Sequence, residues 1–472
     1  MGNIKLNSGQ KKVFEKLKHF ITKDDHDIFI LNGYAGTGKT FLMQYLGDYL
    51  DKNKMPFNLL ASTGRAAAIL RGKTKFSART VHSYLYKFDK VSGVNDSHNE
   101  QSPIDSYGQM KLQFTFTVPV DQSEKRILIF DEASMISSQD QGETSHAVFG
   151  SGNLMEDIFK VTRNCKLIFV GDPAQLPPVH QLTSPALDKD WLENKGRKVT
   201  QATLTKIERT ESNNDILPTA EQIRFLLQKD NLPKWPKIPF NGRTNISVIP
   251  NENDLIYLYL ENYRKKGPRK TILITNSNRL VWQCNSFIRQ ELYNQVQAEL
   301  KIGDILLVTQ NNYLVPLANG DFVKVIKIGH TKHRANLKFT NVRIRSLITN
   351  KDYDILLAMD VLESYFTNFS ADQNQMLMID FIRRMAISKV QVNTSPFNDA
   401  LRKDPYLNCL KATYGYAITC HKAQGGEWDD VFVLGQKAMH PAPKHIQYVR
   451  WWYTALTRTK HRFYTNSGYW IS

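Results

Sequence analysis

The chain has 472 residues, 41% of them hydrophobic, which is enough material for roughly two to four packed domains. Its 62 basic and 45 acidic residues give a net charge of +17, which favours a polyanionic partner over a merely basic surface without separating DNA, RNA and anionic lipid. Membrane-spanning segments, a signal peptide and a zinc site are not expected, because long apolar runs and close cysteine pairs are missing.

A glycine-rich stretch, GYAGTGKT at 33–40, matches a phosphate-binding loop. The apolar run 28–31 predicts a buried strand before it, and the amphipathic stretch 41–50 predicts a helix after it. Glycines let backbone N–H groups surround a phosphate, and the helix N-terminus adds partial positive charge. We expect Lys39 to reach the β- and γ-phosphates and Thr40 to bind Mg²⁺, so the pattern predicts that the chain binds and hydrolyses a nucleoside triphosphate.

The stretch before this loop, residues 8–21, has helical spacing of apolar residues, with Ser8 as the expected N-cap. Gln10 lies in it, and a glutamine amide can pair with an adenine edge; an ordinary surface glutamine is the alternative. After the loop, residues 57–61 predict a second parallel strand. It runs into Thr63, Gly64 and a helix at 66–70, a natural place for phosphate contacts.

A short helix is expected after Thr80, and it contains His82, whose spacing alone favours a core histidine. Residues 86–125 are polar and turn-rich but include an alternating segment at 111–118. We interpret 86–125 as an inserted β-hairpin, with an irregular surface loop as the alternative.

Two further apolar runs predict strands that end in polar residues. The run 127–130 leads into Asp131 and Glu132, which suit a metal ligand and a group that activates the attacking water. Carboxylate oxygens are the ligands that Mg²⁺ prefers. The run 166–170 leads into GDPAQLPPV, which places Gln175 at the carboxyl edge of a parallel sheet, where such folds bind ligands.

The second half of the chain starts another α/β pattern, with a strand at 272–276 and a helix from Arg279 to about residue 293. Alternating segments at 303–309, 318–327 and 341–345 then predict a small β-barrel, with a turn at Asn319-Gly320. A helical stretch at 373–384 is interpreted as an arm that emerges from this barrel.

The motifs GYAGTGKT, TGRAAA, RTVHS, IFDEASM and GDPAQLPPV, in this order, resemble those of superfamily-1 helicases, with most similarity to the RecD-like and Dda-like branch, 1B. Residues 204–209, 416–427 and 453–458 are similar to the fourth, fifth and sixth motifs of that family. The resemblance runs from Gln10 to Arg458. It implies an α/β fold with two RecA-like P-loop motor domains and an SH3-like barrel inserted in the second, with ATP and Mg²⁺ bound between the motor domains.

The resemblance also assigns roles to individual residues. The catalytic residues would be Lys39, Glu132, Gln175, Arg209 and Arg458, with both arginines contacting the γ-phosphate. The nucleotide site would comprise Gln10, Gly33, Gly36, Thr37, Gly38, Lys39, Thr40, Arg209, Gln424, Glu427 and Arg458, with Thr40 and Asp131 on the metal. Contacts to DNA would come from Thr63, Gly64, Thr80, His82, Thr275, Thr419 and His421. Separately from the resemblance, we hypothesise that the hairpin is a wedge and that Phe114 or Phe116 stacks against the fork.

We therefore predict an ATP-dependent DNA helicase that moves 5′→3′ on single-stranded DNA and acts at single-strand to duplex junctions. It is expected to be a cytoplasmic monomer of bacterial or phage type, with a role in DNA repair or recombination. A translocase that displaces proteins, a nucleotide-gated subunit of a recombination or defence complex, and an RNA helicase remain as alternatives. We expect the first motor domain to comprise residues 1–85 and 126–205, and the second to comprise residues 206–300 and 409–472. The hairpin would be 86–125, and the barrel and arm would be 301–408.

Overall fold

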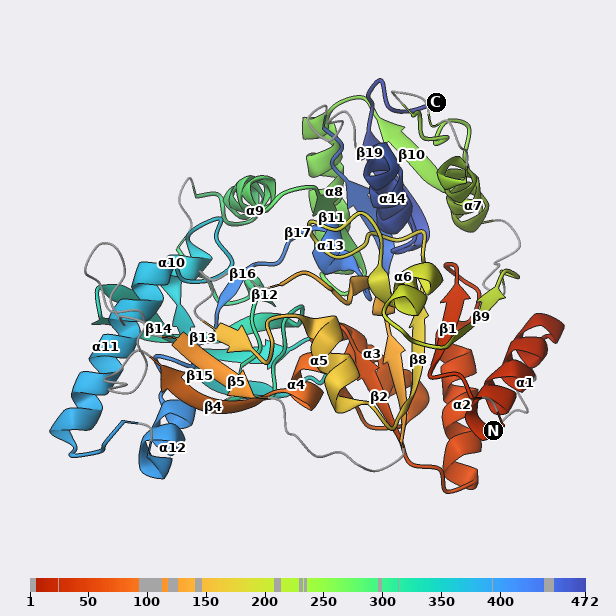
Figure 1. The fold of residues 1–472 in the computed structure, drawn as a ribbon. Helices are drawn as coiled ribbons and strands as arrows, with labels where there is room; N and C mark the ends of the chain where they lie inside the picture. The colour runs from red at the N-terminus through yellow and green to blue at the C-terminus, as the bar shows by residue number, and fades with distance from the viewer. Residues whose placement is uncertain are drawn as a thin grey trace.

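A computed structural model describes residues 6–23, 25–92, 113–117, 126–140, 147–207, 214–228, 232, 236–295, 299–312, 314–392, 394–436 and 445–472. Three sheets dominate these residues, and a fourth is small. In the view of Figure 1 the sheet built by the first part of the chain lies at the lower right, a second lies at the top, and an antiparallel sheet lies at the left. Within the described residues, no helix is both long and apolar enough to cross a bilayer.

The first α/β unit is a parallel sheet with strand order β3-β2-β6-β8-β1-β9. Apolar residues on its two faces form separate clusters, so helices cover it on both sides. Its strands are β1 (Ile28–Gly33), β2 (Phe57–Ala61), β3 (Ala78–Thr80), β6 (Ile127–Asp131), β8 (Lys166–Gly171) and β9 (Val199–Leu204). Its helices are α1 (Ser8–Thr22), α2 (Lys39–Lys52), α3 (Gly64–Thr74), α4 (Val81–Leu85), α5 (Leu154–Val161) and α6 (Lys189–Asn194), with 3-10 turns η1 (Ala133–Met135) and η2 (Pro185–Leu187).

The second α/β unit is also a parallel sheet, with strand order β10-β19-β18-β11-β17. Its strands are β10 (Ile246–Ile249), β11 (Thr271–Thr275), β17 (Ala417–Thr419), β18 (Trp428–Val433) and β19 (Thr459–Asn466). Its helices are α7 (Ile216–Leu227), α8 (Glu252–Lys266), α9 (Asn278–Tyr293), α13 (Cys420–Ala423) and α14 (His445–Leu456). The chain leaves this sheet after β11 and returns at β17, so the intervening segment is an insertion.

The inserted segment forms an antiparallel unit with strand order β15-β14-β13-β12-β16. Its strands are β12 (Ile305–Val308), β13 (Phe322–Arg334), β14 (Leu337–Ser346), β15 (Asp352–Ala358) and β16 (Ala412–Tyr414). Its helices are α10 (Met359–Leu362), α11 (Ala371–Ile387) and α12 (Ser395–Lys403). This unit shares one continuous apolar core with the second α/β unit.

A buried polar cluster fixes the two ends of this insertion to α9. Arg289 of α9 donates through Nε and Nη2 to the carboxylate of Asp304, at 3.1 and 2.9 Å. Tyr416, where the chain returns, donates to the same carboxylate over 2.7 Å. Because all three groups are buried, breaking any one contact would leave a polar atom unpaired in the core.

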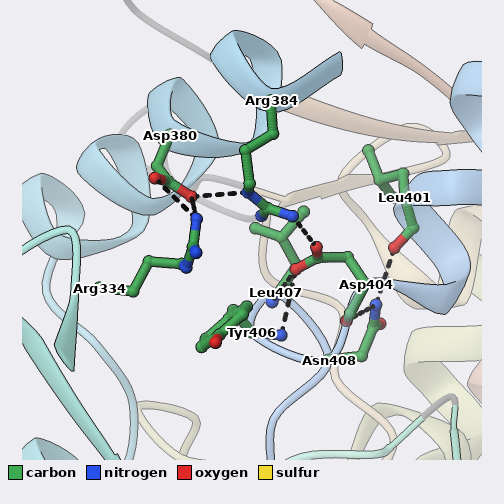
Figure 2. A network of polar contacts seen from close by, with 8 residues as sticks. All are labelled: Arg334, Asp380, Arg384, Leu401, Asp404, Tyr406, Leu407 and Asn408. Carbon is green, nitrogen blue, oxygen red and sulfur yellow. Dashed lines mark hydrogen bonds and ion pairs between the residues drawn. The ribbon is translucent and has the colours of Figure 1, made fainter. Parts of the chain in front are cut away.

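Helices α11 and α12 are attached to the antiparallel unit by the network drawn in Figure 2. Asp380 of α11 accepts hydrogen bonds from Arg334 at the end of β13, at 3.2 Å, and from Arg384, at 2.9 Å. Arg384 also donates to Asp404, just after α12, over 2.6 Å. The arm is therefore held by charge-assisted contacts at its base.

The small sheet pairs β4 (Lys87–Ser92) antiparallel with β5 (Gln113–Thr117), and β5 parallel with β7 (Ala147–Phe149). The β4–β5 pair lies within the hairpin expected at 86–125, which stays a prediction because its connecting residues lie outside the described part of the chain. Its third strand comes from beyond that range. The expected division into four domains remains a prediction.

Most of the predicted helices and strands are present within a few residues of their expected bounds. One detail was wrong: the N-cap of α1 is Asn7, not Ser8. Asn7 Oδ1 accepts from the backbone N–H of Gln10 over 2.7 Å, and Gln10 Oε1 accepts from the backbone N–H of Asn7 over 3.2 Å. This reciprocal pair stabilises the helix start more fully than a serine one residue later would.

Candidate nucleotide site and nucleic-acid interface

The phosphate-binding loop connects β1 to α2, as the sequence predicted. Gly36 and Gly38 have φ of +76° and +81°, a left-handed conformation that disfavours residues with a side chain. Lys39 Nζ donates to the carbonyl oxygens of Gly33 and Tyr34, at 2.6 and 3.2 Å, so its ammonium group lies over the loop. The loop therefore presents a cation and a helix N-terminus at one place, which suits a phosphate chain.

Gln10 packs directly against this loop. Its Nε2 donates to the carbonyl of Thr37 over 3.3 Å, and the side chain is buried. A Cβ on Gly38 would come within 2.6 Å of the same Nε2. The structure thus places Gln10 beside the nucleotide loop, while its predicted contact with a base stays a prediction.

Asp131 and Glu132 end β6 beside the loop. Burial raises the pKa of Asp131 to about 7, and the neighbouring Glu132 carboxylate adds to the rise, whereas Lys39 and Lys73 oppose it. Glu132 has a left-handed backbone with φ of +50°, and its Oε2 is buried without a hydrogen-bond partner among the described residues. Two half-buried carboxyl groups, one with a buried oxygen that lacks a partner among the described residues, fit a site completed by a divalent cation and a water molecule.

Two glutamines predicted for the nucleotide site come from different α/β units. Gln175 follows β8, and Gln424 follows α13; both are buried, and the side-chain oxygen of each has no partner among the described residues. Gln424 Nε2 donates across the units to the carbonyl of Leu176 over 3.0 Å. This hydrogen bond links Gln424 to the residue after Gln175, while the roles of both glutamines at the nucleotide stay predictions.

A second contact across the units involves α14. Tyr453 donates from its hydroxyl to Asp172 Oδ2 over 2.7 Å, and the same hydroxyl accepts from the backbone N–H of Ala35 in the loop over 3.3 Å. Thr454 accepts from the backbone N–H of Leu176 over 2.9 Å. Burial, followed by the Asp172 carboxylate, raises the pKa of Tyr453 well above its usual value, so the hydroxyl keeps its proton.

Arg458 lies two residues after the same helix and is 5% exposed. Its guanidinium donates to the carbonyls of Thr454 and Gly426, at 3.1 and 3.4 Å, and to the hydroxyl of Thr457, at 3.0 Å. Neutral oxygens hold it, which leaves the cation suited to an anionic ligand. Glu427 is the residue after Gly426, and Arg209 lies outside the described residues.

A pocket adjoins the phosphate loop on the side of α7. The guanidinium of Arg224 stacks 3.8 Å from the ring centroid of Tyr34 and donates to Glu221 over 2.9 Å. The pocket is lined by Tyr34 and Ala35 of the loop, by Leu217, Glu221 and Arg224 of α7, and by Tyr453.

The residues predicted to contact DNA lie mostly at the carboxyl ends of strands. Thr63, Thr80 and Thr419 are N-caps of α3, α4 and α13, and each hydroxyl oxygen accepts a backbone N–H bond. Thr275 ends β11 and is fully buried. A capping hydroxyl can still donate its own proton, so the three N-caps remain suitable phosphate ligands.

The two predicted histidines have different surroundings. The ring of His82 packs against Tyr86 and Phe149, with centroids 5.6 and 5.8 Å apart, and burial lowers its pKa. The side chain of His82 is half-buried, and both its predicted DNA contact and the core alternative stay predictions. Burial also lowers the pKa of His421 in α13. Phe114 and Phe116 lie in β5, for which the structure describes the backbone and not the side chains.

A groove between α9 and the antiparallel unit carries exposed aromatic rings close to the strand end at Thr419. Trp282 and Tyr365 are 39% and 45% exposed. Burial lowers the pKa of Lys422, on the groove wall, to about 8. Aromatic rings beside hydroxyls and a lysine are the composition of a surface for single-stranded nucleic acid. The polar lining includes Asn278, Ser364, Thr367, Thr413, Thr419 and Lys422.

Four residues at these sites had no predicted role: Tyr453, Asp172, Trp282 and Tyr365. For Tyr453, the only indication of a role in the sequence was a tyrosine hydroxyl on the apolar face of the helix that precedes Arg458. Nothing in the local pattern marked Trp282 or Tyr365, because the groove forms only when the insertion packs beside α9.

The fold and the loop define a P-loop nucleotide-binding protein with two α/β units. Residues 5–225 match the AAA domain family, and residues 414–464 match the UvrD-like helicase C-terminal domain. The ATP-dependent RecD2 DNA helicase of Deinococcus radiodurans is 23% identical over 451 residues, which cover 93% of this chain and 47% of the relative. The chain thus spans about half the length of that relative.

Other similar proteins are also helicases. The ATP-dependent DNA helicase Pif1 of Bdellovibrio bacteriovorus is 30% identical over 159 residues, covering 34% of this chain and 31% of that protein. A solved structure of Pif1 helicases at forked duplex DNA matches 99% of this chain and 93% of its own, with a TM-score of 0.52 and 16% identity. The match to a Bacteroides Pif1 structure with ADP-AlF3 and single-stranded DNA covers 100% of this chain and 94% of the Pif1 chain, with a TM-score of 0.50 and 15% identity. In sequence the chain is therefore similar to the RecD2 and Pif1 helicases.

Proposed function

We propose that this chain is an ATP-dependent DNA helicase that moves 5′→3′ along single-stranded DNA. The observation that carries the proposal is the hydrogen bond that the backbone N–H of Ala35, in the phosphate loop, donates to the hydroxyl of Tyr453 in the second α/β unit. A nucleotide on the loop would lie next to groups from both units. Hydrolysis would then change how the units pack, which is what a motor needs.

In the proposed site Lys39 binds the β- and γ-phosphates, and Thr40 and Asp131 hold Mg²⁺. The ion would neutralise charge on the phosphates during transfer. Glu132 orients the attacking water and accepts its proton, and Gln175 lies near the γ-phosphate. Arg458, with Arg209, stabilises charge on the transferring oxygens when the units close.

The DNA path would cross the strand ends that carry Thr63, Thr80 and Thr419 and enter the groove with Trp282 and Tyr365. Threonine hydroxyls and backbone amides hold phosphates without reading sequence, as a translocating motor requires. We also propose that the antiparallel unit corresponds to an SH3-like barrel with an arm, and that the hairpin with Phe114 and Phe116 splits the duplex. A cytoplasmic monomer acting in repair or recombination fits this activity.

Unwinding of tailed duplexes tests the proposal. With ATP and Mg²⁺, the wild-type chain should separate a duplex with a 5′ single-stranded tail and leave a 3′-tailed duplex intact. Unwinding from the 3′ tail would overturn the polarity. ATP hydrolysis and protein displacement without unwinding would instead identify a translocase, and stimulation by RNA alone would change the substrate.

A further inference from the structure

Arg65 of α3, in the first α/β unit, projects into a slot formed by the other two units. Its guanidinium carbon lies 4.2 Å from the ring centroid of Trp428, at the start of β18, and 5.0 Å from that of Phe322, at the start of β13. The two rings are 6.4 Å apart and nearly perpendicular, at 78°. One cation therefore contacts aromatic faces from two different units at once.

The backbones around this slot approach very closely. A Cβ at Gly64 would overlap Ala318 Cβ of the antiparallel unit, and a Cβ at Gly426 would lie 2.8 Å from the guanidinium carbon of Arg65. Glycine at these two positions is required for the contact as it stands. The first α/β unit is thus seated on the other two where Arg65 enters.

Aromatic ring faces hold the guanidinium of Arg65. Burial lowers its pKa to about 10, with Arg458 acting in the same direction and Asp321 and Glu427 opposing it. Its Nη1 is buried without a hydrogen-bond partner among the described residues. An arginine held mainly by aromatic ring faces can leave its site more readily than one held by a bidentate salt bridge to a carboxylate.

The slot is continuous with the groups that hold Arg458. Trp428 donates from its backbone N–H to the carbonyl of Arg458 over 2.9 Å, and Gly426 accepts from the Arg458 side chain. At the other end, Arg65 follows Thr63 and Gly64, at the edge where DNA phosphates are proposed to bind. A displacement of that edge would therefore move the segment that places Arg458.

We infer that Arg65 is a positioning residue that, by entering the slot between Phe322 and Trp428, couples occupancy of the nucleic-acid edge to the placement of Arg458. The inference rests on the proposed function. Arg65 acts through residues 426–428 and contacts neither the nucleotide nor the reacting atoms in this account. Its loss should reduce the stimulation that DNA gives to hydrolysis more than it reduces nucleotide binding.

The test compares Arg65→Gln, Arg65→Lys and the control Arg163→Gln, an exposed arginine of the first α/β unit. Arg65→Gln should lower kcat with saturating single-stranded DNA by about ten-fold, with KM for ATP and Kd for DNA within about two-fold of wild type, because it removes the cation that contacts both rings. Arg65→Lys should restore part of the rate, and Arg163→Gln should match wild type. Melting temperatures report whether each variant folds.

Phe322→Leu and the double variant Arg65→Gln/Phe322→Leu complete a double-mutant cycle between Arg65 and Phe322. If both residues act through one contact, the double variant should be little worse than Arg65→Gln alone. Fully additive losses would overturn the inference, as would an Arg65→Gln variant with normal DNA stimulation. A parallel loss of DNA affinity would make Arg65 a phosphate ligand and also overturn it. A wild-type chain without DNA-stimulated hydrolysis would refute the proposed function instead.

Discussion

The hydroxyl of Tyr453 donates to Asp172 over 2.7 Å and accepts from the Ala35 amide over 3.3 Å, so one side chain joins α14 to two loops of the other α/β unit. Tyr453→Phe removes both contacts and leaves a buried carboxylate oxygen short of a donor, which costs about 1–3 kcal/mol. We predict a lower melting temperature and slower ATP hydrolysis. The control is Tyr453→Phe/Asp172→Asn, whose combined loss should be smaller than the sum of the single losses; strict additivity would argue against the link.

A second prediction concerns Glu132, whose Oε2 is buried without a partner among the described residues. Glu132→Gln should raise the melting temperature, because it removes a buried unpaired charge beside Asp131. It should also abolish hydrolysis while ATP binding, followed with a fluorescent analogue, is retained. A variant that is less stable than wild type would show that the carboxylate has a structural partner.

The groove between α9 and the antiparallel unit gives a third prediction. Trp282→Ala and Tyr365→Ala should each weaken binding of single-stranded DNA by about 1–3 kcal/mol, the usual worth of stacking a base on an aromatic ring. Fluorescence anisotropy with a labelled oligonucleotide measures this. Tyr257→Ala, on the exposed side of α8, is the matched control; equal losses in all three variants would refute a specific groove.

The fourth prediction is a pH dependence. Burial lowers the pKa of Lys422 to about 8. Its ammonium is therefore mostly protonated at about pH 7 and mostly neutral at about pH 9, so its attraction for a phosphate falls as pH rises through that window. Bound DNA would itself raise this pKa and move the window upward.

Binding of single-stranded DNA by the wild type should consequently weaken between these two pH values. Lys422→Gln should bind more weakly at the lower pH and lose most of the pH dependence. A wild-type affinity that does not change with pH, or a variant that keeps the full change, would exclude Lys422 from the interface.

Local patterns were sufficient to predict the phosphate loop, the Asp131-Glu132 strand end and the helices beside them, because their geometry depends on contiguous residues. The antiparallel strands of the insertion were also predictable from alternation. The slot of Arg65 and the bridge of Tyr453 were not, because each needs partners from units that are far apart in the chain. Arg65 was visible only as part of the motif TGRAAA, and its aromatic partners lie more than two hundred residues away.

The central claim is that the phosphate loop drives a DNA-dependent motor. The most direct measurement is ATP hydrolysis with and without single-stranded DNA, for wild type and Lys39→Ala. The account predicts strong stimulation by DNA in the wild type and loss of hydrolysis in a folded Lys39→Ala variant, because the ammonium over the loop can no longer stabilise the phosphates. Hydrolysis that DNA does not stimulate, or that survives the substitution, would contradict it.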